Sequence, residues 1–306
     1  MKNLKLGFAA CLTAAFLFSG CSKDDNESDD QQRLLLSVER IQKDKDGNIT
    51  GTSKTENKYD SQGNCIESIT ETTSENGLSY QVKTLNKYDG HGNLLEIESY
   101  LDGVLALKES YTYEGNVETH ESTSYFRGAI ISSSKQIITY TDSNRDNIKT
   151  SVTTMNFDNS TSVTKQETSY DKDGKVEMIV TFENDELTQR VVFNRDVDTE
   201  THYLYFSDGK TDESKSYTLT ITYSGNKQTS LLEYFDGKKV ENEKIVTSNS
   251  EGRLSGSESY ENGRLVSKIT DCVYNGKVES YTLYNYSDPN STEPTTIAYY
   301  TLTYNK

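Results

Sequence analysis

A short turn motif recurs along the chain and constrains its fold more than any other feature. It consists of a glycine, a polar residue and an apolar residue, and a tyrosine often stands three or four residues before the glycine. Asp or Asn opens such a turn by bonding to the backbone ahead of it, and Gly takes the positive-φ position. The copies are Gly47-Asn48-Ile49, Gly63-Asn64-Cys65, Gly92-Asn93-Leu94, Gly115-Asn116-Val117, Gly174-Lys175-Val176, Gly252-Arg253-Leu254, Gly263-Arg264-Leu265 and Gly276-Lys277-Val278.

Shorter turns lie between these copies and have the composition of tight hairpin loops. With both kinds counted, a turn signal comes about every 12–15 residues and separates strands of about 7–10 residues. The pattern predicts an all-β fold, a long antiparallel meander of repeated hairpins that forms a single domain over residues 33–306. The short turns are Glu75-Asn76-Gly77, Asp102-Gly103, Phe126-Arg127-Gly128, Glu183-Asn184-Asp185 and Glu261-Asn262-Gly263.

The composition indicates a thin core that is rich in tyrosine. Only 32% of the residues are hydrophobic, yet the chain holds 22 Tyr and 9 Phe, too many aromatics for a disordered chain. We therefore expect Tyr rings to supply much of the buried area while their hydroxyls stay in water. Simple alternation in the stretch 104–113 places Leu105, Leu107, Glu109, Tyr111 and Tyr113 on one face and Val104, Ala106, Lys108, Ser110 and Thr112 on the other.

The charge of the chain excludes one class of partner. The formal net charge is -16. Nucleic acids are bound by clustered Lys and Arg, so no nucleic-acid partner is expected. Electrostatic adsorption on anionic lipid is disfavoured for the same reason. The simplest role of so much acid is solubility.

Residues 1–20 have the pattern of a signal peptide. Lys2 and Lys5 form its positive start, and Leu6 to Phe18 form a short apolar run. The following Leu17-Phe18-Ser19-Gly20-Cys21 resembles a bacterial lipobox, although Phe18 stands where that motif usually has Leu. The resemblance implies cleavage before Cys21 and attachment of this acylated cysteine to outer-membrane lipid. An ordinary signal peptide with an incidental cysteine is the alternative.

Residues 21–32 form an acidic segment after the cleavage position. Beyond Cys21 the segment has no apolar residue, so we expect a disordered tether that reaches about 35 Å when extended. Its Lys23, Asp24 and Asp25 resemble the surface-export signal of Bacteroidota-type lipoproteins. That resemblance implies an outer-membrane lipoprotein exposed at the cell surface. A plain acidic spacer on a periplasm-facing lipoprotein remains the alternative.

Two cysteines remain within residues 33–306. Cys65 stands in its repeat where Leu94 stands in the next one, so it replaces a core hydrophobe. Cys65 and Cys272 lie near opposite ends of the repeats, and we predict two separate buried thiols rather than a disulfide. No paired Cys or Cys/His spacing supports a structural zinc ion.

The repeats resemble two known groups. YDSQGNCIE, YDGHGNLLE and YDKDGKVEM resemble YD (RHS-type) repeats, and YENGRLVSKI and YFDGKKVENE are similar to hairpin repeats of the MORN-variant group. The resemblance implies a curved β-sheet or an open solenoid. The chain has too few units to close a large shell, so we do not expect the encapsulating role of large RHS-type proteins.

The search for chemistry finds no catalytic or cofactor motif. His91, His120 and His202 have no second ligand at metal spacing, and no nucleophile has an evident base. One loop offers a weak calcium site through Asp142, Asn144 and Asp146. Its twelfth position is Thr153 rather than Glu, so ordinary turn formation explains the loop better.

Tyrosine pairs are the remaining candidates for binding. Tyr203 with Tyr205, or Tyr300 with Tyr304, could stack on sugar rings, although packing between strands explains them equally well. We therefore expect a non-enzymatic, membrane-anchored cell-surface lipoprotein that binds a protein or glycan through a Tyr-rich β-surface. A periplasm-facing structural or assembly lipoprotein and a glycan-active hydrolase are the alternatives. An integral β-barrel is disfavoured because Lys and Glu interrupt both faces of the strands.

Overall fold

The computed structural model describes residues 34–142, 145, 147–157, 160–195, 199–206, 209–275, 278–288 and 291–305. The chain divides into two units, Met1–Arg33 and Leu34–Lys306, and every strand belongs to the second. The proposed lipid-attachment residue Cys21 and the export-signal residues Lys23, Asp24 and Asp25 lie outside the described residues. In the described ranges, no helix is long and apolar enough to cross a membrane.

Twenty strands follow one another in the second unit. They are β1 Leu35–Lys43, β2 Ile49–Tyr59, β3 Cys65–Ser74, β4 Ser79–Tyr88, β5 Leu94–Leu101, β6 Val104–Glu114, β7 Val117–Phe126, β8 Ala129–Tyr140, β9 Ile148–Phe157, β10 Ser160–Tyr170, β11 Val176–Glu183, β12 Glu186–Arg195, β13 Thr199–Phe206, β14 Tyr217–Ser224, β15 Lys227–Tyr234, β16 Lys239–Ser248, β17 Leu254–Glu261, β18 Arg264–Asn275, β19 Val278–Asn285 and β20 Thr296–Tyr304. They lie between the predicted turns, so the antiparallel meander is confirmed.

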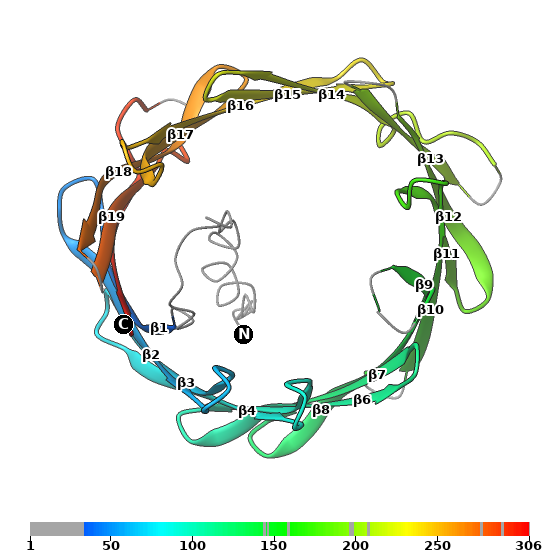
Figure 1. Ribbon diagram of the computed structural model, residues 1–306, viewed down its shortest axis with the longest axis horizontal. Coiled ribbons are helices and arrows are strands. Elements are labelled where there is room, and N and C mark those ends of the chain that lie inside the picture. Colours follow the sequence, from blue (N-terminus) through cyan, green and yellow to red (C-terminus); the bar gives the residue numbers. More distant parts are fainter. Residues whose placement is uncertain are drawn as a thin grey trace, which may run out of the picture. The chain divides into compact units, whose positions relative to one another are not determined.

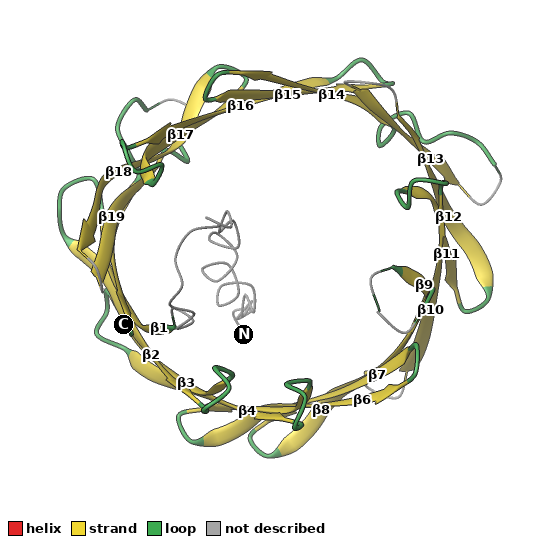
Figure 2. Ribbon diagram, viewed as in Figure 1, coloured by secondary structure: helices red, strands yellow, loops and turns green. Residues whose placement is uncertain are grey.

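The sheet closes on itself as a barrel (Figures 1 and 2). Each strand pairs antiparallel with the next, and β20 also pairs antiparallel with β1 from Leu35 with Tyr304 to Lys43 with Ile297. The expectation of an open solenoid is therefore wrong. Closure pairs the backbone groups of the first and last strands, which an open sheet would leave as two exposed edges.

The two ends of the barrel carry different turns because successive strands run in opposite directions. Most copies of the glycine motif lie at one end of the barrel, including the turns 60–64, 89–93, 171–175 and 249–253. Strand β1 begins at this end and β20 ends at it. We call this end the tyrosine rim, because strands reaching it often end in Tyr. At the other end lie the tight turns, and we call it the hairpin rim. In Figure 1 the β5–β6 and β7–β8 hairpins, cyan to green, spread outward from the ring.

One Asp or Asn side chain organises each of the long turns 60–64, 89–93, 171–175 and 249–253. In the 89–93 turn, Asp89 Oδ1 accepts hydrogen bonds from the backbone N–H groups of His91 and Asn93, both at 2.8 Å. Its Oδ2 accepts a third from Asn93 Nδ2 at 2.7 Å, and Gly92 has φ +84°. Asp60 makes the same three kinds of bond in its own turn. The motif is therefore explained by turn chemistry.

The tight turns also shift the faces of the strands. Asp102 and Gly103 both have positive φ, 49° and 79°, as a two-residue hairpin turn requires. Ala106 is an extra, unpaired residue, because Tyr100 pairs with Leu105 whereas Ser99 pairs with Leu107. Ser99 and Tyr100 point to opposite faces, so Leu105 and Leu107 do too. Placing these leucines on one face was wrong, because simple alternation ignores the bulge.

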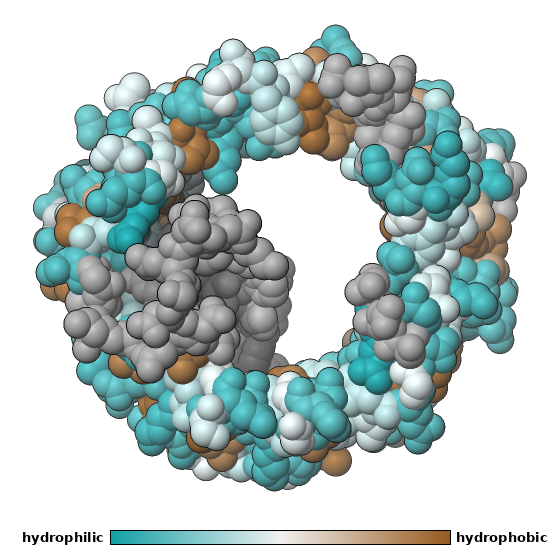
Figure 3. All heavy atoms as spheres, in the orientation of Figure 1, coloured by the Kyte–Doolittle hydropathy of each residue, from teal (hydrophilic) through white to brown (hydrophobic). Residues whose placement is uncertain are grey.

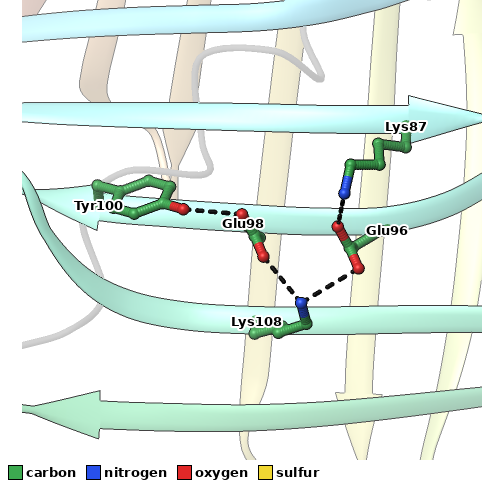
Figure 4. A network of polar contacts seen from close by, with 5 residues as sticks. All are labelled: Lys87, Glu96, Glu98, Tyr100 and Lys108. Carbon is green, nitrogen blue, oxygen red and sulfur yellow. Dashed lines mark hydrogen bonds and ion pairs between the residues drawn. The ribbon is translucent and has the colours of Figure 1, made fainter. Parts of the chain in front are cut away.

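The pairing registers assign every strand residue to one of two faces, since paired residues share a face. One face holds the Lys–Glu ion pairs of the described strands, among them those of Lys108 with Glu96 and Glu98. In Figure 4 these side chains lie in front of the β4–β6 wall, and strands of the opposite wall are visible behind it, so this face is the outer one. The inner face carries mainly Tyr, Ser, Thr, Gln and aliphatic residues.

The barrel is a single layer with almost no core. Of the hydrophobic residues described, only Ala298 and Leu302 are buried, and both lie on β20 next to the closure. Viewed through the opening of the ring, hydrophobic residues appear as separate patches among hydrophilic ones (Figure 3). The expected thin core is thus thinner still, and the backbone hydrogen bonds between strands carry much of the structural order.

Asp89→Ala should lower the midpoint of thermal unfolding at pH 7, because it removes three hydrogen bonds that hold one turn. The Asn93 amide lowers the pKa of Asp89 in the folded chain, so its stabilisation exists above the unfolded pKa of about 3.9 and is lost as the pH falls through the folded pKa. The difference between variant and wild type should therefore shrink in acid. Glu75→Ala, in a tight turn, is the control, and equal midpoints at pH 7 would contradict the role of Asp89.

Candidate binding surfaces

The tyrosines of the tyrosine rim have a structural role. A Tyr at or near the end of an even-numbered strand donates its hydroxyl hydrogen to the carbonyl of the first residue of the preceding strand. Five of the ten two-strand units are therefore joined at the hairpin rim by their turn and at the tyrosine rim by a side chain. The bonds are Tyr59 to Leu35 (2.7 Å), Tyr88 to Cys65 (3.1 Å), Tyr113 to Leu94 (2.9 Å), Tyr170 to Ile148 (2.7 Å) and Tyr274 to Leu254 (2.7 Å).

These bonds correct the expectation that the tyrosine hydroxyls stay in water. Two further tyrosines use a carboxylate instead: Tyr140 bonds Glu118 Oε2 at 3.0 Å and Tyr304 bonds Glu279 Oε2 at 3.2 Å. All seven lie on the inner face. The pKa of Tyr59, on the inner face, is raised mainly by burial. The pKa of Tyr100, on the outer face, is raised mainly by its hydrogen bond to Glu98. The inner face is thus the more crowded one.

The outer face carries ion pairs across strands, which among the described residues lie on β1–β8 and β15–β18. In the best-connected group, Lys108 Nζ lies 2.8 Å from Glu98 Oε1 and 3.2 Å from Glu96 Oε2, and Lys87 pairs with the other oxygen of Glu96 (Figure 4). Tyr100 donates to the other oxygen of Glu98 at 2.7 Å. The Lys87 ammonium holds the pKa of Glu96 below its usual value. Such a face is suited to water and is unsuited to contact with lipid tails.

The inner face contains a hollow over β8–β11, near the tyrosine rim. Its volume is 510 Å³. Its strand residues belong to the inner face by register and combine amides, hydroxyls and aliphatic groups with one aromatic ring. The lining consists of Gln136, Ile138, Asn147, Ile148, Ser151, Gln166, Thr168, Tyr170, Gly174, Val176 and Ile179.

Strand register brings the polar groups of this hollow together. Gln166 on β10 pairs with Ser151 on β9, and Gln136 on β8 donates from Nε2 to Ser151 Oγ at 3.0 Å. Tyr170 is held at the edge by its bond to the Ile148 carbonyl. Sequence reasoning missed these glutamines because isolated Gln and Ser form no motif. The available signal was that Gln136, Ser151 and Gln166 fall on one face once the strands are aligned.

The lining determines which chemistry the hollow supports. The lining residues include no Asp, Glu, His, Cys, Lys or Arg. Amides and hydroxyls can both donate and accept hydrogen bonds, and an aromatic ring can pack on the face of a sugar. The hollow therefore suits a neutral, hydroxyl-rich ligand, and it lacks the carboxylate pair that glycoside hydrolysis requires.

The tyrosine pairs predicted from sequence are packed against neighbouring side chains. Tyr203 and Tyr205 stack on the outer face with ring centroids 6.5 Å apart, and the Arg190 guanidinium lies 4.4 Å from the Tyr205 ring centre. Tyr300 stacks on Tyr281 of the next strand at 4.7 Å. Packing between and along strands accounts for these pairs.

The predicted histidines are distributed over the barrel. His91 lies in the 89–93 turn. His120 stacks on Tyr111 at 4.5 Å, with Nε2 3.5 Å from Glu109 Oε1, and His202 stacks on Tyr217 at 4.5 Å. Of the calcium candidates, Asp142 is described but Asn144 and Asp146 lie outside the described residues. No group of three or more potential metal ligands occurs in the part of the chain that the structure describes.

The two thiols are free, as predicted. Cys65 on β3 and Cys272 on β18 are half-buried rather than buried. The prediction placed the two cysteines at opposite ends of the repeats. Closure pairs β20 with β1, so the two thiols are nearer in space than their sequence separation indicates. β18 and β3 are five strand spacings apart around the ring, about 24 Å at the usual spacing, which is still too far for a disulfide.

Comparisons with known proteins show weak structural likeness only. The chain matches no model of a known protein family, and no curated protein is similar to it in sequence. A porin-like protein from Bacteroides uniformis matches with a TM-score of 0.33 and 11% identity over 89% of this chain and 97% of that one. The Photorhabdus luminescens Tc holotoxin pore matches with a TM-score of 0.16 and 11% identity over 86% of this chain and 24% of that one. The fold assignment therefore depends on the chain's own sheet.

Tyr113→Phe should lower the free energy of unfolding by about 1 kcal/mol, because it removes the bond to the Leu94 carbonyl and keeps the ring. Urea unfolding followed by circular dichroism measures the change. Tyr80→Phe is the matched control, since Tyr80 is 38% exposed and its hydroxyl has no hydrogen-bond partner among the described residues. An equal effect of the two changes would show that the rim hydroxyls do not stabilise the barrel.

Proposed function

We propose that the chain is a lipid-anchored, non-enzymatic protein of the bacterial cell surface that binds a neutral saccharide at the inner hollow. The observation that carries the proposal is the lining of that hollow, where Gln136, Ser151, Gln166 and Tyr170 converge on one face. Two amides and a hydroxyl give directional hydrogen bonds, and the ring gives an apolar surface for a sugar face. A protein partner, the other ligand class expected from the sequence, would favour a larger apolar contact than this lining offers.

The position of the hollow favours binding over turnover. A retaining or inverting glycosidase places two carboxylates about 5–10 Å apart across the bond that is cleaved. A carboxyl on the inner wall beside the hollow, that of Glu118, belongs to the strand partner of the lining residue Ile138 and accepts a hydrogen bond from Tyr140 at 3.0 Å. That carboxylate is engaged in packing between strands and is not among the lining residues. The hydrolase alternative therefore has no site here to support it.

Gln166→Ala should weaken binding of a neutral oligosaccharide about tenfold, the effect of losing one or two hydrogen bonds. Calorimetric titration of the purified chain with neutral gluco-, manno- and galacto-oligosaccharides measures this. Gln228→Ala, a glutamine on the inner face of the distant strand β15, is the matched control. Absence of binding by the wild type, or equal affinity of both variants, would overturn the saccharide assignment.

The anchoring part of the proposal is supported by the leader and tether. The lipobox-like Leu17–Cys21 and the acidic residues after it are the pattern of an exported, acylated protein. Several acyl chains on one cysteine hold a protein on a membrane firmly, because each buried methylene contributes about 0.8 kcal/mol. The outer face of the barrel, with its Lys–Glu pairs, is compatible with a domain held in water beside the membrane.

Cys21→Ser should abolish incorporation of labelled fatty acid into the protein in cells, because the acyl attachment point is gone. Asp24→Asn with Asp25→Asn should leave it in the membrane fraction but protect it from protease added to intact cells. Equal labelling of Cys21→Ser and the wild type would contradict acylation of Cys21. Unchanged protease sensitivity of the double variant would contradict the role of Asp24 and Asp25 as an export signal and favour the periplasm-facing alternative.

A further inference from the structure

The hairpin rim carries most of the strongly exposed apolar side chains of the barrel. Nine large apolar side chains of the described residues are more than half exposed, and seven of them lie at this end. Their exposed fractions run from 52% to 67%. These seven are Ile49, Leu78, Val104, Phe126, Ile130, Met155 and Phe157, whereas Tyr223 and Val273 lie towards the tyrosine rim.

These side chains occupy one arc of the rim. They belong to the five consecutive hairpins from β1–β2 to β9–β10. Two other tight turns at this end, Asn184-Asp185 and Asn262-Gly263, are polar, and Phe235 in the β15–β16 turn is 40% exposed, less than any of the seven. Adjacent hairpins are two strands apart, so the arc spans about 40 Å. An apolar arc of this length on an otherwise hydrophilic ring indicates contact with another apolar phase.

The spacing of these side chains favours lipid over a protein as the apolar phase that they contact. Neighbouring hairpins are about 10 Å apart at their bases, and polar residues such as Asn76 and Asp102 separate the apolar ones. A protein partner needs a continuous complementary surface, whereas acyl chains flow around separate protruding side chains. The Arg127 guanidinium lies 5.3 Å from the centre of the Phe126 ring at one tip, where it could remain among phosphates while the ring inserts.

We propose that the hairpin rim binds the surface of a phospholipid bilayer, with the side chains of this arc inserted below the headgroups. The net charge of -16 opposes anionic lipid, so a zwitterionic surface is the expected partner. The proposal does not depend on saccharide binding. It is compatible with an acylated Cys21, because the 12 residues from Ser22 to Arg33 could extend about 40 Å, beyond the roughly 33 Å rise of a ten-residue strand.

The absence of tryptophan from the chain allows a direct test. Phe126→Trp places a single fluorophore at the hairpin rim, and Tyr223→Trp places one near the tyrosine rim at a residue that is 74% exposed. Both are made in the full chain with Cys21→Ser, so that no acyl chain recruits the protein. Vesicles of phosphatidylcholine, with and without brominated acyl chains, are then added.

The expected result is a blue shift and quenching by brominated lipid for Phe126→Trp but not for Tyr223→Trp. Adding Ile130→Ser and Phe157→Ser to Phe126→Trp should lower the partition coefficient by at least about tenfold. Unchanged Phe126→Trp emission would overturn the proposal, as would equal quenching of both tryptophans, which would show recruitment by the leader. A blue shift that grows with protein concentration without vesicles would show self-association instead and would also overturn it.

Discussion

The pairing of β20 with β1 is the interaction on which the rest of the barrel depends. A single-layer sheet with two buried hydrophobic residues among those described cannot be held by a core. Its order comes from backbone hydrogen bonds repeated around a ring, and that series is complete only when the last strand meets the first. Ala298 and Leu302, the two buried hydrophobic residues of the described chain, lie at this closure, and Tyr300 of β20 stacks on Tyr281 of β19. The little apolar burial that the barrel has therefore coincides with the pairing that spans the longest sequence separation.

Closure also separates the chemistry of the two faces. Long Lys and Glu side chains have room to meet across strands on the convex side, as Lys108 does with Glu96 and Glu98. Rings and short polar side chains fill the more crowded concave side, where Tyr hydroxyls satisfy carbonyls that lie beyond the last pair of each strand. One alternating sequence thus produces an exterior with Lys–Glu pairs and an interior of rings and short polar side chains, and the uncharged candidate saccharide site lies on the second.

The sequence predicts the local structure well because turn chemistry is local. Asp89, Gly92 and Asn93 contain within five residues everything that their turn requires, and the tight turns are equally self-contained. Closure was not predictable in this way, because nothing distinguishes β1 or β20 from the inner strands. Bulges such as the one at Ala106 are invisible to simple alternation, and the hollow at Gln136 and Gln166 needs the register of four strands before its residues meet.

The two-strand unit, joined by a turn at one rim and, in seven of the ten units, by a tyrosine at the other, limits how such a barrel can change in evolution. Antiparallel closure requires an even number of strands, because an odd number would bring the first and last strands together in parallel. Insertions and deletions of whole units widen or narrow the ring in steps of two strands. The start of β1 and the end of β20 stay at the tyrosine rim after every such step, so ring size can vary between related chains without moving the points at which the chain enters and leaves the barrel.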